Sequence, residues 1–254
     1  MTIAQNFSAT PLRRITLVTG ASSGIGRAVA LALARAGAFV VATGRSRERL
    51  AKLADELAGQ GEALPLDVSE PDDIARFMRS VGERHGRIDA LVVNAGVSPN
   101  IEIDALTVAE YQSLMDVNVR GAVFTFTHAL PFLSEGASVV FVGSVAARKG
   151  QPGDAVYAGS KGFVRAFARS LGTSPDLMKR RIRVNVVSPG PIETPLTEEA
   201  TRTPEAKVYV ENLIPMRRWG QDAEVAQAVL FLLSEASSFT TGADLTVDGG
   251  MSHV

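Results

Sequence analysis

The stretch "RITLVTGASSGIG" (residues 14–26) decides the fold of this chain of 254 residues. Its first seven residues are an apolar, β-branched run with the length of a buried strand. The following "GRAVALALARAG" (26–37) has the apolar spacing of a helix. Between them stand Gly20, Gly24 and Gly26. Glycines that end a buried strand and open a helix allow a tight turn and let backbone N–H groups approach a phosphate. The stretch therefore predicts a dinucleotide-binding turn between a strand and a helix.

The spacing of these glycines is G-x-x-x-G-x-G, which differs from the common G-x-G-x-x-G fingerprint. No Gly-Lys-Ser/Thr follows, so the turn is not a P-loop. A purely structural strand-to-helix turn is the alternative interpretation. The position at the first strand–helix junction favours dinucleotide binding.

Short β-branched runs and longer helical patterns alternate along the rest of the chain. This alternation predicts parallel strands joined by right-handed crossovers, with helices on both faces of the sheet. The fold class is α/β, a single-domain Rossmann-type doubly wound parallel sheet. We expect strands at 14–20, 38–44, 62–68, 88–96, 137–144, 182–190 and 243–250, and helices at 26–37, 46–59, 71–86, 107–132, from about 155, and 222–235.

Neither a linker nor a repeat divides the chain, so one domain is predicted for residues 1–254. We expect residues 1–12 to be a flexible N-terminus, and the Thr-, Pro- and Glu-rich segment 191–216 to be a substrate loop.

The composition narrows the possible partners. The 26 basic and 27 acidic residues give a net charge of −1, which offers no broad attraction to nucleic acid or an anionic membrane. Cysteine is absent, and the 3 histidines lie far apart without metal-ligand spacing, so no metal site is expected. The chain carries no signal-peptide pattern and no apolar run of about 18 residues. We expect a soluble, cytoplasmic protein that acts on a small molecule.

The end of the second expected strand bears on the choice of cofactor. An acidic residue at this position usually binds the adenosine ribose hydroxyls. Here Gly44 stands at the strand end, Arg45 and Arg47 follow, and the first acid is Glu48. A guanidinium group pairs with a 2′-phosphate, whereas a carboxylate would repel it. The pattern favours NADP(H) over NAD(H), although these arginines could instead only solvate the start of a helix.

Four motifs in this order resemble the short-chain dehydrogenase/reductase family across nearly the whole chain. They are "TGASSGIG" (19–26), "NAG" (94–96), "YAGSK" (157–161) and "SPGPIETP" (188–195). Each motif alone is weak, but all four in register at the expected strand and helix ends form a specific signal.

The resemblance implies a catalytic set of Asn118, Ser144, Tyr157 and Lys161. Ser144 precedes Tyr157 by 13 residues at the end of an expected strand, and Asn118 lies in "MDVNVRG" on the long expected helix. By resemblance, Ser144 polarises a carbonyl, Tyr157 exchanges the proton, Lys161 also holds the nicotinamide ribose, and Asn118 positions a water.

The resemblance also implies a cofactor-binding set. Asp67 and Val68 would contact adenine, Asn94 would steady the central strand, and residues 189–194 would meet the nicotinamide. Within this last segment, Ile192 and Thr194 would lie near the carboxamide. The full set is Gly20, Ser22, Ser23, Gly24, Ile25, Gly26, Arg45, Asp67, Val68, Asn94, Ala95, Gly96, Tyr157, Lys161, Pro189, Gly190, Ile192 and Thr194.

The spacing of Tyr157 and Lys161 has a chemical reason. Residues i and i+4 of a helix share one face. A hydride that reaches a carbonyl leaves negative charge on oxygen, which needs a proton donor. A free tyrosine has a pKa of about 10, and a nearby ammonium group favours the phenolate. At about 4 Å and an effective dielectric near 20 this attraction is on the order of 4 kcal/mol before desolvation.

Three features depart from the family pattern. Val93 precedes "NAG" where relatives often have a second Asn. Ser23 stands where NADP-preferring relatives sometimes carry a basic residue. Gly172 and Pro175 are expected to end or kink the Tyr-Lys helix early. That helix commonly packs against a partner subunit, so a homo-oligomer is implied, either a tetramer or a dimer.

The predicted function is hydride transfer between NADP(H) and a carbonyl or secondary alcohol, as in a ketone or 3-oxoacyl reductase. An NAD(H)-preferring alcohol or polyol dehydrogenase, a non-catalytic nucleotide-sensing regulator and a scaffold protein are the alternatives. We expect residues 97–106, 145–156 and 191–216 to choose the substrate, which the sequence does not name. We expect Trp219 to pack in the fold and Arg217–Arg218 to lie at the surface.

Overall fold

The computed structural model describes residues 14–99, 101–150, 155–198 and 202–253. Seven parallel strands form one sheet in the order β3-β2-β1-β4-β5-β6-β9. The strands are β1 (Ile15–Val18), β2 (Phe39–Gly44), β3 (Gly61–Pro65), β4 (Ile88–Val93), β5 (Leu133–Val142), β6 (Arg183–Pro189) and β9 (Asp244–Val247). The short strands β7 (Ile192–Glu193) and β8 (Gly220–Gln221) pair separately.

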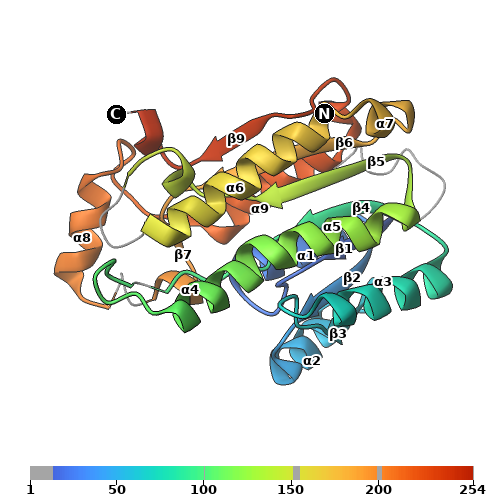
Figure 1. The fold of residues 1–254 in the computed structure, drawn as a ribbon, viewed down its shortest axis with the longest axis horizontal. Coiled ribbons are helices and arrows are strands. Elements are labelled where there is room, and N and C mark those ends of the chain that lie inside the picture. The colour runs from blue at the N-terminus through green and yellow to red at the C-terminus, as the bar shows by residue number, and fades with distance from the viewer. Residues whose placement is uncertain (1–13, 100, 151–154, 199–201, 254) are drawn as a thin grey trace.

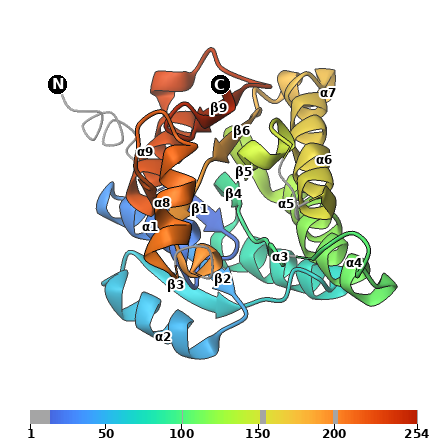
Figure 2. The ribbon, with the colours of Figure 1, turned by 90° about the vertical axis from the view of Figure 1, so that its left-hand side faces the viewer.

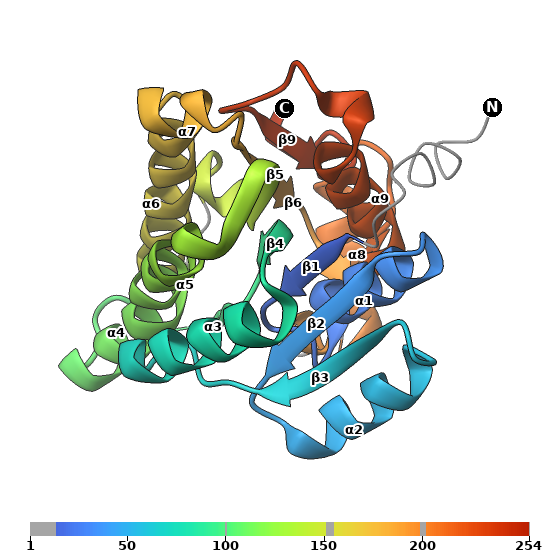
Figure 3. The same ribbon diagram turned by 90° about the vertical axis from the view of Figure 1, so that its right-hand side faces the viewer.

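Helices cover both faces of this sheet, as Figures 1 and 3 show. Helices α1 (Gly24–Arg35), α2 (Arg47–Glu56) and α9 (Asp222–Leu233) pack on one face. Helices α3 (Pro71–His85), α5 (Ala122–Ala129) and α6 (Ala155–Gly172) pack on the other. The remaining helices are α4 (Val108–Met115), α7 (Pro175–Lys179) and α8 (Pro204–Asn212). The doubly wound α/β fold predicted from the sequence is confirmed.

Each strand reads as a continuous apolar run because its successive side chains are buried on opposite faces of the sheet. Side chains of a strand point alternately to opposite faces, and both faces of a parallel sheet are buried. In β2, Val40 and Ala42 join the core with α1 and α9, whereas Val41 joins the core with α3 and α5. The alternation seen in β2 therefore supplies two cores from one sheet.

Predicted helix ends agree with the structure where the signals are local. Pro71 occupies the first turn of α3 together with Asp72 and Asp73, and Gly86 ends this helix in the left-handed conformation. Helix α6 ends at Gly172, and α7 begins at Pro175. The early end of the Tyr-Lys helix was thus predicted correctly.

Other boundaries differ from the sequence-based prediction. The expected helix at 107–132 is helical from Val108 to Phe132, but it is not α-helical throughout: a π-helical turn, η2 (Asp116–Gly121), joins α4 to α5, and α5 runs into the 3₁₀ turn η3 (Leu130–Phe132). The expected loop 191–216 contains the nine-residue helix α8, whose N-cap is Thr203. Strand β3 ends at Pro65, before the expected residue 68. Residues 1–12 lie outside the described residues.

The strand order reverses at β1, which pairs with β2 on one side and with β4 on the other. In open α/β sheets, the carboxyl ends of strands at such a reversal form a crevice for ligands. Figure 2 looks onto these carboxyl ends, with α8 and α4 on opposite sides of them. Within the described segments, no helix is both long and apolar enough to span a membrane.

Candidate active site

The glycine turn after β1 is shaped so that side chains would not fit. Gly20 and Gly24 have φ values of +66° and +51°, a conformation that L side chains rarely adopt. A Cβ atom on Gly26 would lie 2.3 Å from the carbonyl oxygen of Gly20 and 2.4 Å from Asn94 Nδ2. The turn therefore exposes backbone at the start of α1, where N–H groups favour an anion.

Asn94 holds this turn from the end of β4. Its Nδ2 donates to the carbonyl oxygens of Thr19 at 3.0 Å and Gly20 at 3.1 Å. The Thr19 hydroxyl in turn accepts from the backbone N–H groups of Asn94 and Ala95. These contacts fix the glycine turn against β4, and the role of Asn94 beside a cofactor stays a prediction.

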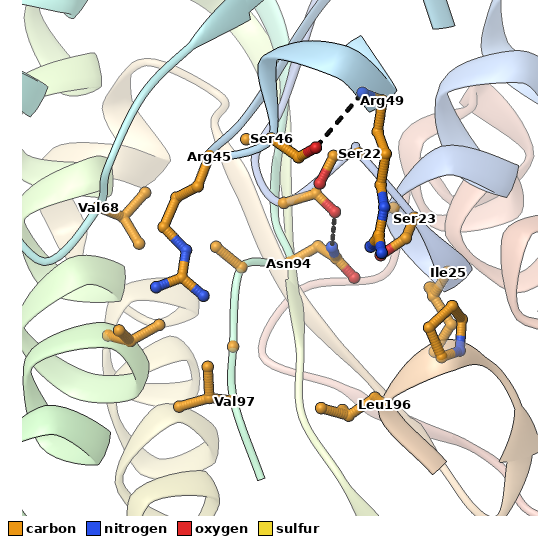
Figure 4. A pocket seen from close by; sticks show the side chains of 18 of the residues that line it. Ser22, Ser23, Ile25, Arg45, Ser46, Arg49, Val68, Asn94, Val97 and Leu196 are labelled. Carbon is orange, nitrogen blue, oxygen red and sulfur yellow. Dashed lines mark hydrogen bonds between the residues drawn. The ribbon is translucent and has the colours of Figure 1, made fainter. Parts of the chain in front are cut away.

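A cavity of about 370 Å³ opens at this point. Figure 4 shows Arg45 and Arg49 extending into it from the end of β2 and the start of α2. Thirteen residues of the predicted cofactor set line the cavity: Gly20, Ser22, Ser23, Gly24, Ile25, Gly26, Arg45, Asp67, Val68, Asn94, Ala95, Gly96 and Thr194. The lining does not include Tyr157, Lys161, Pro189, Gly190 and Ile192.

Two residues of the segment predicted to meet the nicotinamide, Ile192 and Thr194, lie in different surroundings. The Ile192 side chain is 3% exposed and packs in the core. Any contact of Ile192 with a cofactor would therefore be made by its backbone. Thr194 instead faces the glycine turn, because a Cβ on Gly24 would lie 3.2 Å from Thr194 Cβ.

Sequence reasoning missed Arg49 as a cavity residue. It lies in the first turn of α2, where Ser46 Oγ accepts from its backbone N–H at 3.3 Å. The usable signal was its place in the first turn of the helix expected at 46–59, directly after the strand end that carries Arg45. Other lining residues that were not predicted are Gly44, Ser46, Leu66, Val97, Val117, Pro195 and Leu196.

Lys161 is buried on α6 with its ammonium group directed at strand β5. Its Nζ donates to the carbonyl oxygen of Val142 at 2.9 Å and lies 5.9 Å from the centroid of the Tyr157 ring. A Cβ on Gly96 would lie 3.3 Å from both Lys161 Nζ and Asn118 Oδ1. The end of the "NAG" segment, the π-helical turn and α6 therefore meet at one point beside the cavity.

Burial lowers the pKa of Lys161 to about 8. Between about pH 8 and the ordinary value of 10.5, the unfolded chain holds a proton that the folded chain lacks, so the free energy of unfolding rises with pH there. The rise is roughly 3 kcal/mol across this window. We expect Lys161→Met to abolish this rise in urea unfolding of the ligand-free protein.

The control for this prediction is Lys52→Met, since the Lys52 side chain is 68% exposed beside Glu48. Other groups that titrate at alkaline pH contribute equally to the wild type and to both variants. An unchanged pH slope in Lys161→Met would show that Lys161 is protonated in the folded protein throughout the window.

Asn118 lies in the π-helical turn η2 and is 1% exposed. Its side chain forms two hydrogen bonds with the backbone of Val97: Oδ1 accepts at 2.8 Å and Nδ2 donates at 2.9 Å. The same Nδ2 also donates to Ser160 Oγ, which donates to the carbonyl oxygen of Tyr157. Both amide hydrogens of Asn118 are thus engaged. A bound water at this point would donate a hydrogen bond to Asn118 Oδ1 or to a main-chain carbonyl oxygen.

Ser144 stands two residues after Val142, whose carbonyl accepts from Lys161. Its hydroxyl accepts from the backbone N–H of Ala146 at 3.1 Å and caps the 3₁₀ turn η4 (Val145–Ala147). Lys161 and the turn that carries Ser144 are therefore joined through the end of β5.

Helix α8 is tied to the segment that contains Thr194. Glu193 pairs with Lys207 of α8 and accepts from Gln221 Nε2 at 2.8 Å. These two hydrogen bonds lower the pKa of Glu193. Trp219, which is buried as predicted, donates to the carbonyl oxygen of Lys207 at 3.3 Å.

The two arginines before Trp219 are engaged on the protein itself. Arg218 forms an ion pair with Glu224, and Arg217 donates to the carbonyl and amide oxygens of Asn212. These contacts agree with the surface role expected of both residues.

Comparison with known proteins matches this chain to reductases over nearly its whole length. The family model described as "Enoyl-(Acyl carrier protein) reductase" matches residues 20–252. The 3-oxoacyl-[acyl-carrier-protein] reductase FabG of Thermotoga maritima is 37% identical, and the match covers 94% of this chain and 97% of the relative. Versicolorin reductase stcU of Emericella nidulans is 34% identical over 93% of this chain and 95% of its own.

Solved structures agree over the same length. The Pseudomonas aeruginosa RhlG/NADP active-site complex has a TM-score of 0.90 and 32% identity, with coverage of 97% of this chain and 98% of that chain. The structure of gox2181 has a TM-score of 0.92 and 30% identity, with complete coverage of both chains. The matched lengths thus span the part of the chain that holds the glycine turn, the cavity lining and Lys161.

Proposed function

Because this chain belongs to the short-chain dehydrogenase/reductase family of oxidoreductases, we propose that it transfers a hydride between NADP(H) and a ketone or secondary alcohol. The observation that carries this proposal is the meeting of Gly96, Asn118 and Lys161 beside the glycine-lined cavity. The cavity beside these three residues can hold a dinucleotide, and α6, which carries Lys161, can present the proposed proton donor Tyr157 to it.

The residues of the cavity fit a dinucleotide. The turn at Gly20, Gly24 and Gly26 offers backbone where no Cβ would fit, and α1 begins there, so a pyrophosphate is the group it favours. Gly44 leaves no carboxylate at the ribose position, and a Cβ on it would lie 2.9 Å from Ser22 Oγ. Arg45 and Arg49 supply positive charge at the same end, which supports NADP(H).

When bound, the nicotinamide would supply or accept the hydride, and the protein would orient the reactants. In the proposed mechanism, Tyr157 donates its hydroxyl proton to the substrate oxygen during reduction and accepts it back during oxidation. Ser144 donates a hydrogen bond to that oxygen. Lys161 holds positive charge near Tyr157 at neutral pH, and Asn118 fixes the turn beside it. Groups placed where charge develops stabilise the transition state without reorganisation.

The substrate class that we propose is a 3-oxoacyl derivative or a related ketone. Support comes from the FabG and versicolorin reductase relatives, whose names state reductase activity. Exposed apolar side chains on and beside α8 also fit an apolar substrate arm: Leu196, Val208, Tyr209, Leu213 and Met216. A panel of ketones with NADPH, including acetoacetyl-CoA and short β-keto esters, tests this substrate class.

The cofactor preference is tested by parallel fluorescence titrations with NADPH and NADH. We expect the wild type to bind NADPH at least about tenfold more tightly, which corresponds to about 1.4 kcal/mol. We expect Arg45→Ala and Arg49→Ala each to weaken NADPH by about tenfold and NADH by less than about twofold, because the lost guanidinium contacts only the 2′-phosphate.

Arg47→Ala is the matched control, since Arg47 lies between these residues in sequence but not in the cavity lining. Equal weakening of NADPH and NADH by Arg45→Ala would remove its role in reading the phosphate. Tighter binding of NADH by the wild type would favour an NAD(H)-dependent alcohol or polyol dehydrogenase.

We also infer that the chain forms a homo-oligomer through α6. Phe163 of this helix is 42% exposed and stacks on Phe167 with ring centroids 5.7 Å apart. An aromatic pair at an exposed helix face is suited to packing against a second copy.

A further inference from the structure

A buried carboxylate lies next to the proposed catalytic groups without belonging to them. Asp244 begins β9, and its side chain is only 3% exposed. It contacts Arg148, Arg165 and Ser188, which come from three other parts of the chain. We name these four residues the Asp244 cluster.

The first contact leads to Ser144. Arg148 donates to Asp244 Oδ2 from Nε at 3.0 Å and from Nη2 at 2.8 Å, and it also donates to the carbonyl oxygen of Asp244. Arg148 follows directly after η4, the turn capped by Ser144, and its backbone N–H donates to Val145. One 3₁₀ turn therefore separates the guanidinium group from the proposed carbonyl-polarising serine.

The second contact leads to Tyr157 and Lys161. Arg165 lies on α6 four residues after Lys161 and eight after Tyr157, which places the three residues along one side of the helix. Its Nε lies 2.8 Å from Asp244 Oδ2 as an ion pair, at an angle outside hydrogen-bond geometry. The attraction between the charges therefore holds α6 at this oxygen.

The third contact, from Ser188 of β6, links Asp244 to the residue before Ser144. Ser188 of β6 is fully buried and donates to Asp244 Oδ1 at 2.6 Å. A Cβ on Gly143 would lie 2.7 Å from Ser188 Oγ, so the residue before Ser144 packs directly on this hydroxyl. Asp244 thus fixes both neighbours of Ser144, the strand end before it and the turn after it.

These contacts are strong for a physical reason. A carboxylate removed from solvent and paired with guanidinium groups forms charge-assisted hydrogen bonds, which are shorter and stronger than neutral ones. Without the carboxylate, the guanidinium groups of Arg148 and Arg165 would face each other as like charges. The β5–η4 junction and α6 would then lose their common partner.

We propose that Asp244 is a positioning residue: it holds the turn that carries Ser144 in register with the helix that carries Tyr157 and Lys161. Asp244 does not touch the substrate in this proposal. The expected effect on turnover rests on the roles proposed above for Ser144 and Tyr157. The structural claim, that Asp244 holds the turn against the helix, does not depend on those roles.

The structural part is tested by hydrogen–deuterium exchange of the ligand-free Asp244→Asn protein. We expect amide exchange at residues 145–149 to rise at least about fivefold, because the hydrogen bonds of η4 then open more often. The matched control is Asp89→Asn, since Asp89 also accepts from an arginine, Arg87, and a serine, Ser134, but at the opposite end of the sheet. Exchange at 145–149 that is no higher in Asp244→Asn than in Asp89→Asn would overturn the proposal.

The catalytic part is tested by a double-mutant cycle with Ser144→Ala, using NADPH and acetoacetyl-CoA. We expect Asp244→Asn to lower kcat about tenfold on the wild-type background and less than about twofold on the Ser144→Ala background. A displaced Ser144 explains this difference, because small misplacements of reacting groups cost large rate factors. The same factor on both backgrounds would mean that Asp244 does not act through Ser144 and would overturn this part of the proposal.

Two further outcomes are distinguishable. A wild type that reduces no ketone would refute the proposed function, while the exchange experiment would still decide the role of Asp244. If Asp244→Asn does not fold, Arg148→Gln removes the first contact with the carboxylate intact. It is expected to raise exchange at residues 145–149 as well, and unchanged exchange there would overturn the proposal.

Discussion

Tyr157→Phe is expected to reduce ketone turnover at least about a hundredfold while leaving affinity for the nicotinamide cofactor nearly unchanged. The variant removes one hydroxyl group from the first turn of α6 and retains the ring, which lies 5.9 Å from Lys161 Nζ. A positioned acid contributes about a hundredfold or more to the rate of proton transfer. Steady-state kinetics and a fluorescence titration with NADPH measure the two quantities.

Tyr111→Phe is the matched control, because Tyr111 lies on α4 with 45% of its surface exposed. This variant is expected to retain full turnover. Comparable turnover in Tyr157→Phe and the wild type would remove Tyr157 as the acid. A biological function that survives in an inactive Tyr157→Phe protein would favour the nucleotide-sensing regulator or the scaffold.

Gly26→Ala is expected to weaken binding of both NADPH and NADH more than tenfold and to lower the free energy of unfolding by about 1–3 kcal/mol. The added methyl group would occupy a position 2.3 Å from Gly20 O and 2.4 Å from Asn94 Nδ2. The turn and the amide must therefore move apart, and the backbone proposed to bind phosphate moves with them. Urea unfolding and the paired titrations measure these changes.

Gly162→Ala is the control for this substitution. Gly162 lies within α6, and a Cβ there would have no heavy atom within 4 Å apart from its chain neighbours and the adjacent backbone of its own helix. Alanine favours a helix over glycine by roughly 0.5–1 kcal/mol, so this variant is expected to be slightly more stable than the wild type. If Gly26→Ala bound both nucleotides normally, the glycine turn would not be the phosphate site.

The fold could be predicted because its signals are local. The strands are apolar on both faces, and helix ends such as Pro71 and Gly86 carry their own conformational preference. The glycine turn was predictable for the same reason, since Gly20 and Gly24 adopt positive φ values within a single turn.

Features that depend on contacts between distant segments were not predictable. Asp244 reads as an ordinary polar residue at the start of a strand, and only the fold brings Arg148 and Arg165 to it. Helix α8 was missed because its segment is rich in Thr, Pro and Glu, although Thr203 and Pro204 form a recognisable helix start. The roles of the predicted site residues remain predictions, with Lys161, Asn118 and Gly96 meeting at one point.

The π-helical turn at Asp116–Gly121 limits how the chain length can change. A π-helical turn is wider than an α-helical turn, and such insertions often occur at functional sites. Deleting one of these residues would let the turn close as an ordinary α-helical turn, so that Phe126 and Ala129 of α5 would still face the sheet. The residues of the turn itself would shift, and Asn118 would lose its two hydrogen bonds to the backbone of Val97. A one-residue deletion here is therefore expected to spare the core and to disrupt the site.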